Sequence, residues 1–298
     1  MHLSHPSNNK DGMIRQIIAK LISSTKTTIY SILRLLSVLN TKPYIPILVY
    51  HSIGVNNSFF TVTPDEFARQ ISYLTRKYTI VSLEDVYEFV TGQRDLPKKS
   101  VAITCDDGYY DNYLNVFPYV KKYGVPIAIF VVSGHVGKEM TLGNIPLKML
   151  DWGDIIEMSK NGVTIGAHTY SHPDLRRVSL KEAKAQIKTS KDEMEAAIGH
   201  QVSFFAYPKG AYNTSLFAVL TSLDFKAAFG GDGLTCRGEE RYALKRVSID
   251  ASLNFSMFKA SLTVATEWYR KIENFGAKLI LKLPFLSQIA NIYNVQER

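Results

Sequence analysis

Apolar and polar residues alternate along most of the chain in repeating blocks, each a short apolar run followed by an amphipathic stretch. The runs "YIPILVYH" (44–51), "SVAITC" (100–105) and "VPIAIFVVS" (125–133) predict strands. The last of these is nearly all apolar, as expected for a parallel strand that is covered on both faces. Residues 64–78 follow Thr63, a predicted N-cap, with helical spacing of apolar positions.

Seven or eight such units lie between residues 44 and 255, which favours a (β/α) barrel over an open sheet. In a barrel, functional residues lie directly after the strands, on one face. We therefore divide the chain into an N-terminal extension (1–43), a barrel (44–255) and a C-terminal helical extension (256–298). Both extensions are basic and intermittently apolar. Each is expected either to lie in a membrane interface or to pack on the barrel or a partner.

The composition changes this picture little. Of the 298 residues 46% are hydrophobic, as in an ordinary globular protein, and the net charge is +8. That charge is too diffuse to indicate nucleic acid, for which no motif is present. We expect Cys105 and Cys236 to be free thiols, and we find no convincing export signal. Residues 27–40 are interrupted by Arg34 and too short to span a bilayer. The predicted location is cytoplasmic, peripheral to the membrane face.

The candidate functional residues lie at two predicted strand ends. Asp106 and Asp107 follow the strand at 100–105, and His168 and His172 follow the apolar run 163–167. Two imidazoles and one carboxylate can hold Zn²⁺ or a similar ion and leave positions open, while the second carboxylate stays free as a base. The alternative is a loop cap, a solvated acid and two structural histidines.

The segments "TCDDGYYDN" (104–112) and "HTYSHPDL" (168–175) resemble the first two motifs of the polysaccharide deacetylase family, carbohydrate esterase family 4, with its chitooligosaccharide deacetylase homology domain. The resemblance extends through "ILVYHSIG", "LDWGDI", "FAYPKGAYN" and "LKRVSID", so it covers about residues 44–250. It implies a distorted (β/α) barrel of about seven strands. It also implies a metal-dependent hydrolase that removes N-acyl groups, in the first place N-acetyl, from an amino-sugar glycan or a lipid-linked glycan precursor.

The family's residue roles carry over to matching positions. Asp106 corresponds to the general base, and the metal ligands correspond to Asp107, His168 and His172. One divalent ion, zinc with cobalt or nickel as alternatives, would carry the attacking water. The backbone N–H of Lys209 corresponds to the donor that stabilises the oxyanion.

Two motifs depart from the family pattern. Ala206 stands where the family has an Arg that orients the base, and Lys209 stands in place of a Tyr. Arg246 occupies the position of the His that protonates the leaving amine, and an arginine does not give up its proton. We predict that Arg246 contacts Asp106 in place of the missing Arg. His51 would protonate the amine, its alternative being a core histidine.

The residues expected to contact the sugar are aromatic or cationic, with packing as the alternative for the aromatic ones: Trp152, Tyr207, Lys209 and Tyr212. Two other functions stay open. A sugar-binding barrel would keep the metal site with little or no turnover, and a scaffold would bind lipid without metal. The binder has no need of the second carboxylate at Asp106.

Overall fold

The computed structural model describes residues 24–142 and 144–272 of the 298-residue chain. The described residues separate into two compact units, one within 41–258 and one that combines 24–40 with 259–272. The parts of the expected terminal extensions at 1–23 and 273–298 lie outside the described residues.

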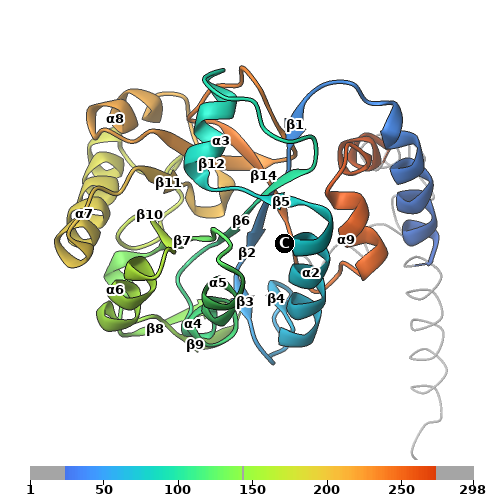
Figure 1. Cartoon of the computed structure of the whole chain (residues 1–298). Helices are drawn as coiled ribbons and strands as arrows, with labels where there is room; N and C mark the ends of the chain where they lie inside the picture. Colours follow the sequence, from blue (N-terminus) through green and yellow to red (C-terminus); the bar gives the residue numbers. More distant parts are fainter. Residues whose placement is uncertain (1–23, 143, 273–298) are drawn as a thin grey trace, which may run out of the picture. The chain divides into compact units, whose positions relative to one another are not determined.

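The larger unit is built on a closed ring of seven parallel strands, as predicted (Figure 1). Around the ring the order is β2, β14, β12, β11, β10, β7 and β6, and β6 pairs again with β2. The strands are β2 (Ile47–Tyr50), β6 (Ser100–Cys105), β7 (Ala128–Val131), β10 (Thr164–Ala167), β11 (Phe204–Ala206), β12 (Ala227–Asp232) and β14 (Leu244–Ser248). Because all are parallel, the loops that follow them meet at one end of the barrel.

Several short strands lie outside the ring of seven. They are β5 (Thr79–Ile80), which pairs with the start of β6, and the pairs β1 (Tyr44–Ile45) with β13 (Thr235–Cys236), β3 (Ser52–Ile53) with β4 (Thr61–Val62), and β8 (Glu139–Leu142) with β9 (Ile145–Lys148). The antiparallel pair β8–β9 is a hairpin that the sequence analysis did not anticipate. It becomes important because it forms part of the site.

Helices lie on the outside of the ring (Figure 1). They are α2 (Pro64–Lys77), α3 (Leu83–Val90), α4 (Tyr110–Asn115), α5 (Phe117–Tyr123), α6 (Trp152–Lys160), α7 (Leu180–Ile198) and α8 (Leu216–Ser222), with the 3-10 turns η2 (Ser133–His135) and η3 (Pro208–Gly210). The predicted cap of α2 is confirmed: the Thr63 side chain accepts a hydrogen bond from the Glu66 N–H.

The interior of the ring is filled by side chains rather than open. Phe130 and Phe229 lie 5.5 Å apart between ring centroids, with Ala102, Ala206 and other small residues beside them. Gly166 makes this packing feasible, since a Cβ atom there would come within 2.4 Å of the Phe130 ring. The packed floor leaves the loops after the strands as the place for a cavity.

The smaller unit contains helical residues 24–36, the turn η1 (Ser37–Leu39) and helical residues 265–272, and α9 (Phe255–Ser261) crosses the unit boundary. Within this unit Tyr30 stacks on Tyr269 at 4.2 Å between centroids. Among the described residues no helix is both long and apolar enough to cross a membrane. Neither Cys105 nor Cys236 forms a disulfide within the described residues.

Candidate metal and catalytic site

Three side chains converge at the ends of β6 and β10, the two strands of the ring that flank β7. Asp107 Oδ1 lies 3.4 Å from His168 Nε2 and 3.3 Å from His172 Nε2. The ligand atoms of this trio all fall within 4.8 Å of one another. Asp107 Oδ1 is buried and has no hydrogen-bond partner among the described residues. A buried carboxylate oxygen without a donor fits a metal ligand, because a cation would satisfy it.

The imidazole of His168 is oriented for ligation. Its Nδ1 lies 2.8 Å from the Ala206 carbonyl oxygen, which can only accept a hydrogen bond. Nδ1 therefore carries a hydrogen, which leaves Nε2, on the side of Asp107, as the nitrogen that can ligate a cation. Ala206 stands where the family has its Arg, so this position serves the site through its backbone. The residues present fit a divalent ion with three protein ligands.

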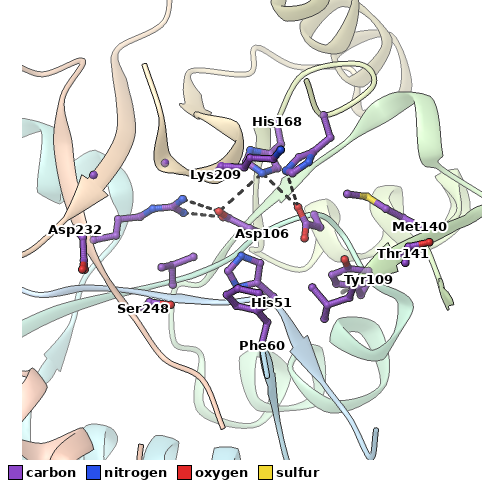
Figure 2. A pocket seen from close by; sticks show the side chains of 17 residues that line it. His51, Phe60, Asp106, Tyr109, Met140, Thr141, His168, Lys209, Asp232 and Ser248 are labelled. Atoms are coloured by element: carbon purple, nitrogen blue, oxygen red, sulfur yellow. Dashed lines mark hydrogen bonds and ion pairs between the residues drawn. The ribbon is translucent and has the colours of Figure 1, made fainter. Parts of the chain in front are cut away.

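Asp106 lies beside the trio and is held by a different partner. Arg246, on β14, donates to both carboxylate oxygens, Nη1 to Oδ1 at 2.7 Å and Nη2 to Oδ2 at 2.6 Å (Figure 2). Arg246 also donates to Thr104 Oγ1 at 3.2 Å, and the pair is buried. The contact predicted between Arg246 and Asp106 is present, while its catalytic importance stays a prediction.

Burial and neighbouring charges shift the pKa values of the two carboxylates and the two histidines. Burial favours a higher pKa for Asp106, but the charges of Arg246 and His168 and the Arg246 hydrogen bonds hold it below the usual value. Burial likewise opposes the fall in the pKa of Asp107, which His168, His51 and His172 together drive far down. Both acids are thus ionised at neutral pH, ready to bind a cation and to accept a proton.

The two histidines differ in the same way. Burial lowers the pKa of His172 to about 4, and the charge of His168 adds to this effect. For His168 burial also favours the neutral form, yet Asp106 and Asp107 raise its pKa above the ordinary value. His172 is therefore a neutral ligand over a wide pH range, whereas a cation must displace a proton from His168.

His51 follows β2 and lines the same cavity as the acids. Its Nδ1 is buried without a partner within the described part of the chain, and its ring lies 5.3 Å from that of Phe60. Asn112 Nδ2 donates to the His51 carbonyl at 2.9 Å, which fixes the backbone of this residue. The cavity has a volume of about 580 Å³, enough for a sugar residue and its acyl group.

Lys209, in η3, lies on the side of the cavity away from His51, with Asp106 between the two (Figure 2). Its side chain is exposed, and no hydrogen bond within residues 24–142 and 144–272 uses its backbone N–H. An unused N–H that borders the cavity suits the predicted oxyanion donor.

Left-handed backbone is concentrated at this rim. Of the five non-glycine residues with positive φ in the described part of the chain, four lie here: Asp107 (71°), Thr169 (67°), His172 (60°) and Lys209 (59°). Thr169 Oγ1 accepts a hydrogen bond from the His172 N–H at 3.0 Å, which locks that turn. Such conformations are costly for residues with a Cβ and gather at functional sites.

The three aromatic residues expected to contact sugar are not among those that line the cavity. Tyr207 is fully buried and its hydroxyl already donates to the Tyr242 carbonyl at 2.9 Å. Tyr212 stacks on Tyr207 at 4.8 Å between centroids, and Trp152 is the first residue of α6. Packing accounts for the Tyr207–Tyr212 pair.

Other lining residues were missed from sequence: Val49, Phe60, Tyr109, Met140, Thr141, Leu142, Gly210, Gly231, Asp232 and Ser248. Two signals could have found some of them. Tyr109 follows the acidic pair directly, and "EMTLGNIPLK" alternates polar and apolar residues around a Gly-Asn turn, which is typical of a hairpin.

Comparison with known proteins gives a consistent result. The sequence model of the polysaccharide deacetylase family matches residues 93–228. YxkH of Bacillus subtilis (strain 168), whose name assigns it to the polysaccharide deacetylases, is 28% identical over 218 residues, covering 72% of this chain and 75% of its own length. A poly-beta-1,6-N-acetyl-D-glucosamine N-deacetylase of Staphylococcus aureus (strain MSSA476) is 26% identical over 182 residues, with 57% and 61% covered. The match thus spans less than two thirds of the staphylococcal enzyme.

Solved structures extend the agreement to the fold. The Streptococcus pyogenes deacetylase PplD, solved in complex with acetate, superposes with a TM-score of 0.66 at 27% identity. The match covers 74% of this chain and 99% of that one. The closed ring of seven strands, with the acids and histidines grouped at its end, agrees with this similarity of the chain to the polysaccharide deacetylase family in sequence and fold.

Proposed function

We propose that this protein is a metal-dependent hydrolase that removes N-acyl groups, in the first place N-acetyl, from an amino-sugar glycan or a lipid-linked glycan precursor. The observation that carries the proposal is the separation of the two adjacent carboxylates. Asp107 belongs to the three-ligand group, whereas Asp106 is held by Arg246 in the same cavity. A barrel that only binds sugar has no use for the second carboxylate.

Asp107, His168 and His172 would hold the ion, with zinc first and cobalt or nickel as alternatives. A divalent ion there would act as a Lewis acid on the amide carbonyl and lower the pKa of water. Asp106 accepts the proton of the attacking water, and Arg246 fixes both of its oxygens for that step. The Lys209 N–H donates to the oxygen on which negative charge develops.

The leaving amine needs a proton, and Arg246 is unsuited to supply it because a guanidinium does not deprotonate. His51 is the remaining imidazole that lines the cavity outside the metal-ligand trio, within the described residues. We assign it the role of general acid, because an imidazole can both donate and accept a proton. Its buried, unpartnered Nδ1 supports this role.

The test uses the purified full-length protein loaded with Zn²⁺, Co²⁺ or Ni²⁺. Bound metal per chain is measured first, then acetate release from N-acetylated glucosamine oligomers. We expect about one ion per chain, lost in Asp107→Ala and His172→Ala. Asp106→Asn should keep the ion and lose turnover by roughly 10²–10⁴-fold. If Asp106→Asn turned over like the wild type, the assignment of the base would be wrong.

We also propose that the smaller unit contacts a membrane surface. Large apolar side chains of its described residues are exposed, among them Leu35 (72%), Val38 (81%) and Leu39 (74%), next to the basic Arg34. Co-sedimentation with vesicles that contain anionic phospholipid, compared with zwitterionic vesicles, tests this. The variant Leu35→Gln/Leu39→Gln should bind less, and equal binding would refute the proposal. A cytoplasmic location stays a prediction.

A further inference from the structure

Tyr109 is held rigidly at the edge of the cavity. It follows Asp107 and Gly108 at the end of β6, and its side chain is completely buried. Its ring packs with Leu142 of the β8–β9 hairpin and with Met149, and its backbone forms a bridge with Met149. The ring therefore has one position, and the hydroxyl is placed by the hairpin.

That hydroxyl is aimed into the cavity. Tyr109 lines it, and Figure 2 shows its oxygen turned towards the centre of the site. Within the described residues the hydroxyl is buried and has no hydrogen bond of normal geometry, although the Asp107 carboxylate is close enough to interact with it. A buried O–H without an acceptor is costly, and such groups are rare in native proteins.

Three cavity-lining residues have buried polar atoms without a partner in the described chain: His51 Nδ1, Asp107 Oδ1 and the Tyr109 hydroxyl. The first belongs to the proposed general acid and the second to a metal ligand. The Tyr109 hydroxyl is not used by either role. As a neutral phenol it is a donor that needs an oxygen acceptor, and the bound substrate would supply one.

We propose that Tyr109 is a further catalytic residue, whose hydroxyl donates a hydrogen bond to the oxygen of the acyl group. This inference rests on the proposed deacetylase function. The acceptor is the amide carbonyl oxygen in the substrate and a carboxylate oxygen in the released acid. Tyr109 transfers no proton, and no bond to it forms or breaks. Its effect is to stabilise negative charge on that oxygen from the side opposite Lys209.

The hairpin also determines which end of the substrate lies there. Met140 and Leu142 line the cavity next to Tyr109, so the acyl oxygen would have apolar carbon beside it. The other side carries Lys209 and Asp232, whose charges suit hydroxyl groups of a sugar (Figure 2). The acyl group is thus placed against the hairpin and the sugar ring away from it.

A competing role is contact with Asp107, in which the hydroxyl would orient a metal ligand rather than the substrate. The variant Tyr109→Phe separates the two because it keeps the ring and removes only the hydroxyl. The matched control is Tyr113→Phe on α4, where the hydroxyl donates to Glu157 at 2.7 Å outside the cavity. Both variants are compared with the wild type in zinc affinity, melting temperature, kcat, KM and acetate binding.

We expect Tyr109→Phe to lower kcat/KM by about 10- to 100-fold at saturating zinc and to weaken acetate binding about tenfold. Zinc affinity and melting temperature should match the wild type, and Tyr113→Phe should change none of these. A fall in zinc affinity, with activity restored by excess zinc, would assign the hydroxyl to Asp107 and overturn the proposal. Unchanged kcat/KM and acetate binding would overturn it as well.

Acetate binding keeps this test separate from that of the proposed function. A wild type that binds zinc but releases no acetate from any oligomer would refute the deacetylase. The zinc-loaded protein would still show, by calorimetry with acetate, whether the Tyr109 hydroxyl contacts a carboxylate. If acetate did not bind even to the zinc-loaded wild type, the contact of Tyr109 with a carboxylate oxygen would be refuted, whereas the deacetylase would still be judged by acetate release.

Discussion

The contact of Arg246 with Asp106 gives the most stringent prediction, because it replaces an interaction that the sequence lacks at Ala206. In Arg246→Gln the Asp106 carboxylate loses two charged hydrogen bonds of 2.7 and 2.6 Å, at a place where the wild-type side chains of Asp106 and Arg246 are each only 5% exposed. Breaking a buried ion pair by removing one partner costs about 3–5 kcal/mol. For a domain of this size each kcal/mol lowers the melting temperature by about 2–4 °C, so we expect a fall of roughly 6–20 °C.

The same substitution should alter the pH dependence of turnover. Without the guanidinium, burial dominates and the pKa of Asp106 rises, so a higher pH is needed to ionise the base. The acidic limb of the kcat/KM profile should therefore shift to higher pH. Arg246→Lys is the matched control: it keeps the charge but cannot bind both oxygens in the same plane, and its shift should be smaller.

Calorimetry and kcat/KM between pH 5 and 9 on zinc-loaded protein would measure both effects. Asp106→Asn/Arg246→Gln, which leaves neither charge buried alone, should recover part of the lost melting temperature. If Arg246→Gln melted and turned over like the wild type at every pH, Arg246 would not support the base. A double variant less stable than the sum of the single ones would contradict the pairing.

Three further predictions concern the rest of the site. His51→Gln should lower kcat/KM about 10²-fold, and an unchanged kcat/KM would assign the acid elsewhere. Zinc affinity should be measured as the pH is lowered from 8 to 5. It should begin to fall before pH 6.5 is reached, because the raised pKa of His168 lets protons compete with the ion there, while His172 competes only near pH 4. An affinity that stayed constant down to pH 5 would contradict this. The backbone of Lys209 is left-handed, with a φ of 59°. The variant Lys209→Ile should melt roughly 2–8 °C below Lys209→Gly, since a β-branched residue disfavours this conformation and glycine does not. Equal melting temperatures would show that the turn relaxes.

The ring of strands and the positions of Asp106, Asp107, His168 and His172 could be predicted, because parallel strands bring their following loops to one end. The contact of Arg246 with Asp106 could be predicted as well, since the chain has an arginine where the family has a His and lacks the family's Arg at Ala206. Tyr109 could not, because its importance comes from a hydroxyl without a partner, and pairing is visible only in three dimensions. For Tyr207 and Tyr212 the sequence predicted contact with the sugar, whereas in the structure the two rings stack on each other. Such packing cannot be inferred from residue type alone.

The left-handed turns at the rim tie ion binding to the closure of the barrel. Asp107, Thr169, His172 and Lys209 hold conformations that an isolated loop would avoid, and the ring keeps them there: the Val132 N–H donates to the Asp107 carbonyl at 3.3 Å. The three donors meet only when β6, β7 and β10 are paired, so the unfolded chain has no comparable affinity for the ion. Ion binding and folding are then linked equilibria. A substitution anywhere that opens the ring weakens the affinity for the ion, and an occupied site resists unfolding by the same free energy.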